Sequence, residues 1–296
     1  MHALNFSGSD SLSTPYQYQI ELLIPSKFNI EDLLNQEATL ELFTGNKNYY
    51  KKIYGIIYKH EEININNHFQ HIKINLNPKL LLLDKFSQQR FLAKISLQNL
   101  IRKILDNHKI DYDLLINNNP MINIAHQAGE SDLNFLSRIL ERHGIHYFFD
   151  HNQASKLIIT DRLDFHPQDH HPNTMVYAMS SKNKVNTEYN GIYSFSCQQQ
   201  KTPKKIICTS YAPWHSNLSL AREEIIDENG YGVLYFDYPE ATSYQDLEYF
   251  SKIKSLEIQS QQKQSQQKHL HFYSKPVITT HLNNTQKKIT IQTILS

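Results

Sequence analysis

Several residue types are scarce in this 296-residue chain, and each scarcity excludes a class of protein. Two cysteines are too few for a disulfide framework, and eight glycines leave few places where a backbone can approach a phosphate closely. The longest pure aliphatic run, Leu80 to Leu83, is far too short to span a bilayer. A net charge of +1 gives no reason to expect a nucleic-acid or anionic-membrane partner.

Recognisable targeting and catalytic motifs are also missing from the sequence. The first residues, Met1 to Asn5, contain no basic segment followed by an apolar one, so we predict a protein made in a cytoplasm without a secretory signal peptide. The chain has no GxSxG elbow, P-loop or GxGxxG motif. We therefore predict no catalytic, cofactor-binding or metal-binding residues. The length suggests two or three compact units.

What is present first is β structure, over residues 1–86. Tyr16, Tyr18, Ile20 and Leu22 alternate with polar residues, which is the pattern of a strand buried on one face. Further short strands at similar spacing are typical of a barrel or sandwich, so we predict that residues 1–86 form a first β-barrel. A short helical turn is expected at Ile30 to Leu34.

Residues 87–165 change to a helical period and predict an α/β segment between two β-rich flanks. One helix is predicted near residues 96–106, where Ser96 can cap an apolar stripe. A second is predicted near 131–143, where Leu133, Leu136 and Leu140 fall on one face. Ser131 or Asp132 can begin it, and Gly144 can end it in a left-handed conformation.

Residues 166–296 return to β structure and predict a second β-barrel-like domain. A helix is predicted near residues 244–259, and the Gln-rich segment 259–268 is expected to be a solvated helix end or a loop. Strands are predicted from Val277 to Leu282 and from Lys288 to Leu295.

The stretch from Glu130 to Phe149 also carries a resemblance to a known family. It resembles the signature of VgrG proteins, the spike proteins of type VI secretion systems, and of the related late control D proteins of phage tail hubs. Residues 12–22, 38–40, 53–57, 76–83 and 236–239 resemble further family motifs in the same order. The sequence departs from the family at Asn35-Gln36, where Gly-Gln is usual, and at Tyr54, where His is frequent.

The resemblance implies a fold and an assembly. The implied fold is β-rich α+β, with two β-barrel domains joined by an α/β segment, as in a phage baseplate hub. The implied function is a structural hub of a type VI spike or contractile tail, without enzymatic activity and delivered through the secretion system. The implied partners are two further copies in a homotrimer, a hexameric Hcp-like tube protein, and a separate spike or effector polypeptide. Since the family's spike domain is missing from the sequence, we expect a weak trimer that the tube strengthens.

A rival hypothesis is an enzyme that handles a metal or a glycan. Its candidate residues are the densest group of imidazoles and carboxylates, Asp161, His166, Asp169, His170 and His171. Imidazole and carboxylate groups are ordinary zinc ligands. A solvated loop is the alternative interpretation, because the adjacent His170 and His171 seldom aim at one ion and a metal site needs fixed geometry.

The positions of the two cysteines allow a prediction of the register between the strands on either side of residues 201–204. If residues 201–204 form a four-residue hairpin loop, Cys197 lies opposite Cys208, close enough for a disulfide that a reducing cytoplasm would keep open.

Overall fold

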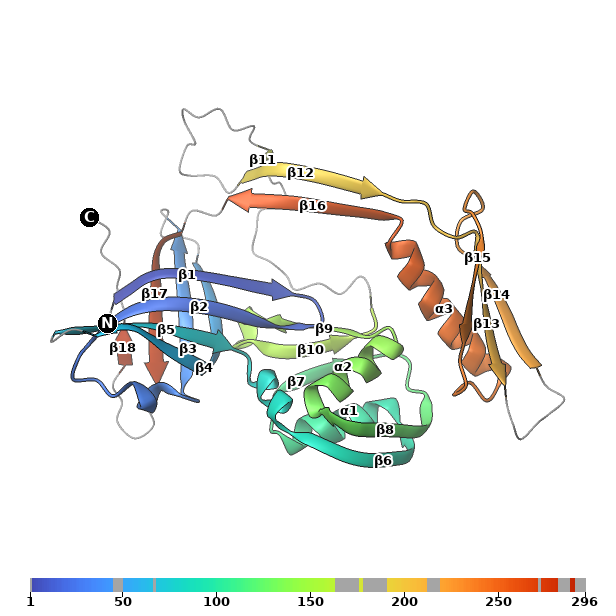
Figure 1. Ribbon diagram of the computed structural model, residues 1–296, viewed down its shortest axis with the longest axis horizontal. Coiled ribbons are helices and arrows are strands. Elements are labelled where there is room, and N and C mark those ends of the chain that lie inside the picture. The colour runs from blue at the N-terminus through green and yellow to red at the C-terminus, as the bar shows by residue number, and fades with distance from the viewer. Residues whose placement is uncertain are drawn as a thin grey trace. The chain divides into compact units, whose positions relative to one another are not determined.

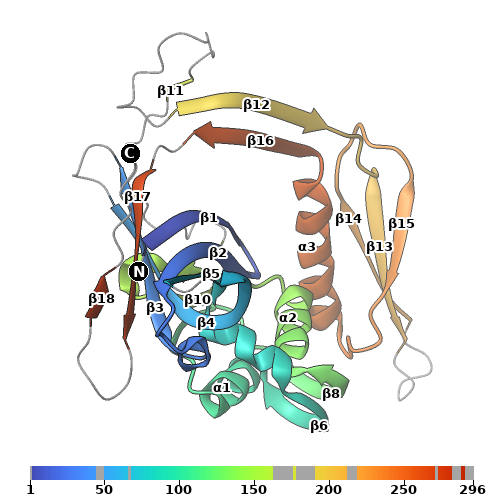
Figure 2. The same cartoon turned by 60° about the vertical axis from the view of Figure 1, so that its left-hand side comes forward.

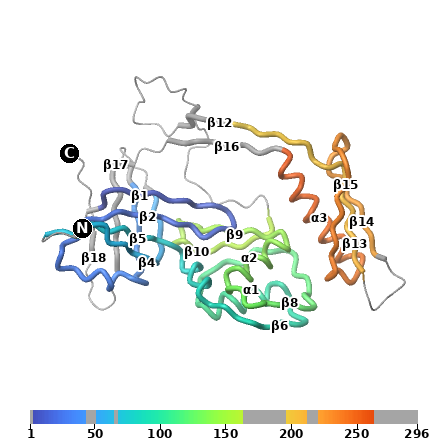
Figure 3. Tube along the Cα trace, in the orientation of Figure 1, coloured from blue at the N-terminus to red at the C-terminus, as the bar shows by residue number. Residues whose placement is uncertain are grey.

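In the computed structural model, residues 2–44, 50–65, 68–162, 176–177, 191–211, 219–270, 273–281 and 288–290 are described. Side chains are described along the coloured parts of the trace in Figure 3. The chain divides into two compact units: residues 1–172, 186–189 and 271–296 form unit 1, and residues 173–185 and 190–270 form unit 2. The β-rich α+β class predicted from the sequence is confirmed.

Unit 1 is built on a seven-stranded sheet in the order β1-β2-β5-β4-β3-β17-β18, which curves strongly (Figures 1 and 2). Every neighbouring pair of strands in it is antiparallel. The strands are β1 (His2–Ser11), β2 (Thr14–Pro25), β3 (Glu37–Thr44), β4 (Tyr50–Ile65), β5 (Phe69–Asn77), β17 (Tyr273–His281) and β18 (Lys288–Thr290).

The alternation that predicted strand β2 is confirmed by burial. Tyr16, Tyr18, Ile20 and Leu22 are all buried, while the residues between them are at least partly exposed. Ile20 lies opposite Ile74 of β5, so the apolar faces of neighbouring strands coincide. Short 3-10 turns follow β2 and β5, at η1 (Ile30–Leu33) and η2 (Lys79–Lys85), and η1 confirms the predicted helical turn.

Strands β17 and β18 belong to unit 1, although the sequence-based division placed them within the 166–296 domain. Strand β17 pairs with β3, with Ile278 opposite Leu40. The alternation of residues along a strand identifies the strand but carries no information about which distant strand it will pair with. The sequence pattern therefore predicted strand β17 but not the sheet to which it belongs.

The α/β segment of unit 1 contains both predicted helices, α1 (Leu97–Asn107) and α2 (Asp132–Arg142). Ser96 caps α1 as predicted, accepting a hydrogen bond from the Asn99 N–H. The other elements are β6 (Ser87–Ser96), β7 (Tyr112–Leu115), β8 (Met121–Ser131), β9 (His146–Asp150), η3 (His151–Gln153) and β10 (Lys156–Thr160). Strands β6 and β8 form a two-stranded ribbon, and β7, β10 and β9 form a small mixed sheet. Both helices bury their apolar stripes in one core with the large sheet.

The described part of unit 2 contains two three-stranded sheets and one long helix. The elements are β11 (Val176–Tyr177), β12 (Gly191–Gln199), β13 (Lys205–Tyr211), β14 (Ser219–Ile225), β15 (Val233–Asp237), α3 (Tyr244–Ser260) and β16 (Lys263–Leu270). Helix α3 confirms the helix predicted near 244–259. Ser243 and Asp246 begin it with a reciprocal capping box. The interpretation of 259–268 as a loop or helix end is wrong, because β16 pairs along β12 over most of that segment.

Helix α3 covers one face of the β14-β13-β15 sheet. Ile206 and Cys208 of β13 are buried against Leu247 and Phe250 of the helix. The Phe250 ring stacks on Tyr238, with ring centroids 5.2 Å apart. This is a small core of its own, separate from the core of unit 1.

The predicted pairing of Cys197 with Cys208 is wrong. Cys197 lies opposite Ser265 of β16, whereas Cys208 lies between Arg222 of β14 and Phe236 of β15. Between Cys197 and Cys208 the chain passes from the β11-β12-β16 sheet to the β14-β13-β15 sheet. The Gln200 N–H donates to the Gln262 carbonyl, but the Lys204 N–H donates to the Gly232 carbonyl. Strands adjacent in sequence need not pair, and here they do not.

The two thiols should differ sharply in reactivity. Cys197 is exposed, whereas Cys208 is buried. The pKa of the Cys208 thiol is raised to about 11, mainly because the thiol is buried and secondly because the negative charge of Glu224 lies nearby. Because the thiolate is the reactive form, we expect iodoacetamide to modify one cysteine of the folded protein and two after denaturation. Mass spectrometry should place the single adduct on Cys197, and Cys197→Ser should remove it. Equal modification of both thiols would contradict the structure.

Candidate assembly surface

The Glu130–Phe149 stretch folds as helix, glycine stop and strand. Ser131 is the N-cap of α2, and its hydroxyl accepts from the Asn134 N–H at 3.2 Å. Leu136 and Leu140 are each 1% exposed, as the stripe predicted. The helix ends at Arg142 with His143 as its C-cap, and the next residue, Gly144, has a φ of +65°, so the left-handed conformation inferred from the sequence is present.

Asp132 has a role that the sequence did not reveal. Its side chain is 1% exposed and lies at the centre of a buried polar network. Arg90 Nη2 donates to Oδ1 at 3.3 Å, and Gln127 Nε2 donates to the same oxygen at 2.9 Å. His108 Nε2 lies 2.8 Å from Oδ2, which also accepts from Gln88 Nε2 at 3.1 Å.

This Asp132 network joins β6, β8 and α2 to His108, the C-cap of α1. A buried carboxylate is tolerated only when charges and hydrogen bonds compensate its lost hydration, and here both oxygens are occupied. The partners come from strands and helices that are 24 to 44 residues away in sequence, except for Gln127. The network therefore fixes α2 on the β6–β8 ribbon, and it leaves no free carboxylate oxygen for chemistry.

The rest of the signature motif also serves packing. Arg138 forms an ion pair with Glu130 and donates to the His126 carbonyl at 2.8 Å. Its guanidinium lies 5.3 Å from the centroid of the buried Phe135 ring. These contacts tie the exposed side of α2 to β8.

His143, the C-cap of α2, gives unit 1 a predicted pH dependence. Burial, and then the charge of Arg142, lower the pKa of His143 to about 4. In the unfolded chain the His143 imidazole has its ordinary pKa near 6.5. Between about pH 4 and pH 6.5 the imidazole is therefore protonated in the unfolded chain but not in the folded chain. Stability is therefore complete above about pH 6.5 and should fall by about 3 kcal/mol as the pH drops to about 4. Urea unfolding of His143→Gln across this range should lose most of that slope, and a slope that survives would contradict the assignment.

Ser155, His151 and Asp10 of unit 1 are linked by hydrogen bonds, but their contacts hold the backbone of β4 in place. His151 Nδ1 lies 2.7 Å from Ser155 Oγ, and His151 Nε2 lies 2.9 Å from Asp10 Oδ2. The Ser155 hydroxyl also accepts from the Tyr54 N–H at 3.1 Å, and the Tyr16 hydroxyl donates to the Tyr54 carbonyl. This part of β4 has no pairing with β5, so these side chains satisfy the backbone groups that β5 leaves open.

The candidate metal residues are only partly within the described part of the chain. Asp161 is described, and its Oδ2 accepts from the Asn117 and Asn118 N–H groups at 2.9 and 3.1 Å, so it caps a loop. His166, Asp169, His170 and His171 lie outside the described residues. Among the residues that are described, no three His, Cys, Asp or Glu side chains cluster as metal ligands. Within the same residues, no helix is both long and apolar enough to cross a membrane.

Exposed apolar residues gather on the outward face of the β6–β8 ribbon. Phe91 and Ile124 are 68% and 69% exposed, and Met121 is 61% exposed. The Phe91 ring stacks flat on His126 of the opposite strand, with centroids 3.9 Å apart. The inward residues Leu92 and Ala125 pack on the core, so the ribbon is apolar on both faces.

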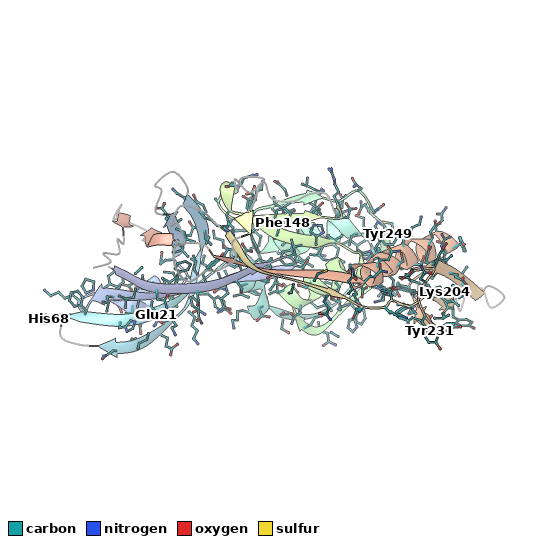
Figure 4. The ribbon with its side chains drawn as sticks, turned by 90° about the horizontal axis from the view of Figure 1, so that it is seen from above. Glu21, His68, Phe148, Lys204, Tyr231 and Tyr249 are labelled. Atoms are coloured by element: carbon teal, nitrogen blue, oxygen red, sulfur yellow. The ribbon has the colours of Figure 1, made fainter. Side chains whose placement is uncertain are left out.

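A second apolar face lies on the β14-β13-β15 sheet, opposite α3. Ile225 and Val233 flank Lys205 in one row, and Tyr235 lies beside Ile207 in the next. Tyr235 is 71% exposed. Tyr231 lies near Lys204 at the margin of this sheet (Figure 4), where its N–H donates to the Thr202 carbonyl. The Lys205–Glu223 ion pair, with its nitrogen and oxygen 2.8 Å apart, lies on the same face, so the exposed apolar residues border a charged pair. Exposed apolar patches with polar surroundings mark interaction sites in soluble proteins.

Comparison with known proteins now decides the family. The profile of the phage tail baseplate hub (GPD) family matches residues 9–273. The chain belongs to this family. It is 25% identical over 164 residues to the type VI secretion system spike protein VgrG4b of Pseudomonas aeruginosa, covering 54% of this chain and 20% of that protein. It is 27% identical over 162 residues to VgrG5 of the same organism, covering 53% and 20%. The chain thus spans about a fifth of the length of these curated relatives.

Solved structures agree on the fold. The E. coli c3393 protein, a type VI secretion component described as similar to the T4 tail proteins gp27 and gp5, superposes with a TM-score of 0.53 at 15% identity, covering 100% of this chain and 74% of that one. A tail protein from Neisseria meningitidis MC58 gives 0.55 at 12% identity, with 97% and 78% covered. The predicted VgrG and phage-hub resemblance is confirmed, and the fold is that of tail-hub proteins.

Proposed function

We propose that this chain is the hub part of a type VI spike or contractile tail, that it acts as a homotrimer, and that it seats a hexameric tube. The family match over residues 9–273 carries the proposal. The two-unit organisation agrees with it, since two barrels per chain and three chains would present six similar modules to a six-membered tube. Closure of unit 2 as a second barrel is part of the proposal.

The role is structural rather than enzymatic. The buried carboxylate of Asp132 and the Ser155 hydroxyl are both engaged in packing contacts, and Asp161 caps a loop. No described residue set favours the metal- or glycan-handling alternative. We propose that the protein is present in the cytoplasm before assembly and leaves through the secretion system, with a separate spike or effector polypeptide as a further partner.

Exposed apolar surface is the physical reason to expect self-association. A stable interface needs well over about 1,000 Å² with an apolar centre, and the two apolar faces described above are candidates for that centre. Association must overcome roughly 4–15 kcal/mol of lost rigid-body freedom. We therefore expect a weak trimer whose population rises with concentration.

Sedimentation velocity from low to high micromolar protein tests this proposal. The expected result is a shift from the mass of one 34.8 kDa chain toward that of three. A dimer that never proceeds further, or a tetramer, would overturn the proposed symmetry. Phe91→Ser and Tyr235→Ser on the two apolar faces are informative variants, because both side chains are exposed and neither lies in a core.

A further inference from the structure

Two apolar faces remain exposed in the described part of the chain, one on each unit. The ribbon face is the outward side of β6 and β8, and its exposed apolar residues are Phe91, Ala93, Met121 and Ile124. The sheet face is the side of the β14-β13-β15 sheet opposite α3, and its exposed apolar residues are Tyr211, Ala221, Ile225, Val233 and Tyr235. The other side of each set of strands packs in a core, so both faces belong to folded, supported strands.

The residue types of the two faces are those of an interface centre. Phe91 and Met121 on the ribbon face, and Tyr211 and Tyr235 on the sheet face, are of types enriched where proteins associate. The charged residues within the sheet face, Lys205 and Glu223, are already paired with each other at 2.8 Å. Burial of this pair would therefore not leave either charge without a partner.

Aromatic rings make these faces large enough for a stable contact. Phe91, Tyr211 and Tyr235 are between 62% and 71% exposed. Because an aromatic side chain can bury roughly 150–250 Å², these three rings offer on the order of 400 Å² of contact area. Ile124 and Ile225 extend the two faces further. A standard interface buries about 800 Å² on each partner, of which the apolar centre is only a part, so faces of this size are sufficient for that centre.

Unpaired charges at the margins of the two faces have opposite signs. Lys94 follows Ala93 on β6 and is exposed, and no described residue forms an ion pair with it. Asp237 lies two residues after Tyr235 on β15, is also exposed, and forms no ion pair with a described residue. The other charged side chains of the ribbon are paired within unit 1, as Arg90–Asp132 and Glu130–Arg138. Opposite charges favour the approach of one face to the other and disfavour the approach of either face to its own copy.

The symmetry of the trimer requires a contact between two different surfaces. This step rests on the proposed function. In a closed ring of three identical chains, each contact joins one surface of a copy to another surface of its neighbour. A face that paired with itself would give a two-fold dimer instead. The ribbon face and the sheet face supply one surface for each side of such a contact.

We propose that the ribbon face of one copy packs on the sheet face of the next copy around the trimer. The aromatic and aliphatic side chains form the centre of this contact. Lys94 of one copy and Asp237 of the other lie at its margin.

Complementation between two variants tests the contact with the intact chain. Phe91→Ser damages only the ribbon face and Tyr235→Ser only the sheet face, so each should lower the association constant about tenfold or more. An equimolar mixture retains one intact ribbon face and one intact sheet face. We therefore expect the mixture to form heterodimers in sedimentation velocity, at a concentration where each variant alone is monomeric. Leu12→Ser and Leu256→Ser change side chains that are exposed outside both faces, and they should leave association unchanged.

Cross-linking shows which surfaces meet. Ala93→Cys on the ribbon face and Ala221→Cys on the sheet face replace exposed alanines, in a Cys197→Ser background that removes the exposed native thiol. A short bismaleimide should give covalent dimers when the two variants are mixed, and none with either variant alone. In the matched control, Asn99→Cys on the exposed side of α1 takes the place of Ala93→Cys and should give no cross-link to Ala221→Cys.

The outcomes separate this contact from the trimer itself. A trimer that both serine variants leave unchanged, with no cross-link in the mixture, would overturn the contact and leave the proposed function standing. Two other results would also overturn the contact: cross-links formed by Ala93→Cys alone, or serine variants that lose tube binding without any change in self-association. A chain that stays monomeric at every concentration, alone and with tube protein, would overturn both the contact and the proposed function.

Discussion

Asp132→Ala is expected to lower the free energy of unfolding of unit 1 by about 3–5 kcal/mol. The substitution removes the carboxylate but leaves the Arg90 guanidinium, which is 16% exposed, and His108 without their shared partner. The amides of Gln88 and Gln127 lose an acceptor at the same time. Unpaired buried polar groups cost more than the pair itself contributed, which is why the expected effect is large.

One variant separates charge from shape at this position, and a second, at an exposed aspartate, is the control. Asp132→Asn keeps the volume and one acceptor oxygen, so its cost should lie between that of Asp132→Ala and zero. Asp111→Ala removes a carboxylate that is 83% exposed in the same unit and should change stability by less than about 0.5 kcal/mol. Urea unfolding followed by circular dichroism measures all three. A loss below about 1 kcal/mol for Asp132→Ala would contradict the network.

Leu136→Ala is expected to cost about 2–5 kcal/mol, because it removes buried methyl groups and leaves a cavity. Leu136 lies on α2 in the core that joins the helices to the large sheet, and it is 1% exposed. Well-packed neighbours such as Phe135 and Leu140 have little freedom to fill the space.

Leu12→Ala is the matched control for this cavity. It makes the same chemical change in the same unit at a side chain that is 56% exposed, and the expected loss is within about 0.5 kcal/mol. Similar losses for the two variants would show that α2 does not present Leu136 to the core.

The local parts of this fold were predictable from the sequence, and particular residues show why. Alternation placed Tyr16 to Leu22 on a half-buried strand, because the two faces of a strand alternate with period two. Ser131 and Gly144 marked the ends of α2, because capping and positive φ are properties of single positions.

What the sequence missed depends on long-range partners. The burial of Asp132 is set by Arg90 and His108, which are 42 and 24 residues away, and no local pattern distinguishes such an aspartate from an N-cap. The Cys197–Cys208 register failed because the chain changes sheets between them. Backbone hydrogen bonds from Gln200 to Gln262 and from Lys204 to Gly232 cannot be read from the intervening turn residues. The resemblance of the Glu130–Phe149 stretch supplied the hub fold that periodicity alone did not.

We propose that this hub-family chain seats a hexameric tube. Sedimentation of the chain mixed with cognate tube hexamers tests it most directly, because a ligand that binds only the assembled ring must also stabilise that ring. We predict that tube hexamers convert the weak trimer into a stable complex of three hub chains on one hexamer, at concentrations where the hub alone is largely monomeric. A strict monomer that never responds to the tube would contradict the account.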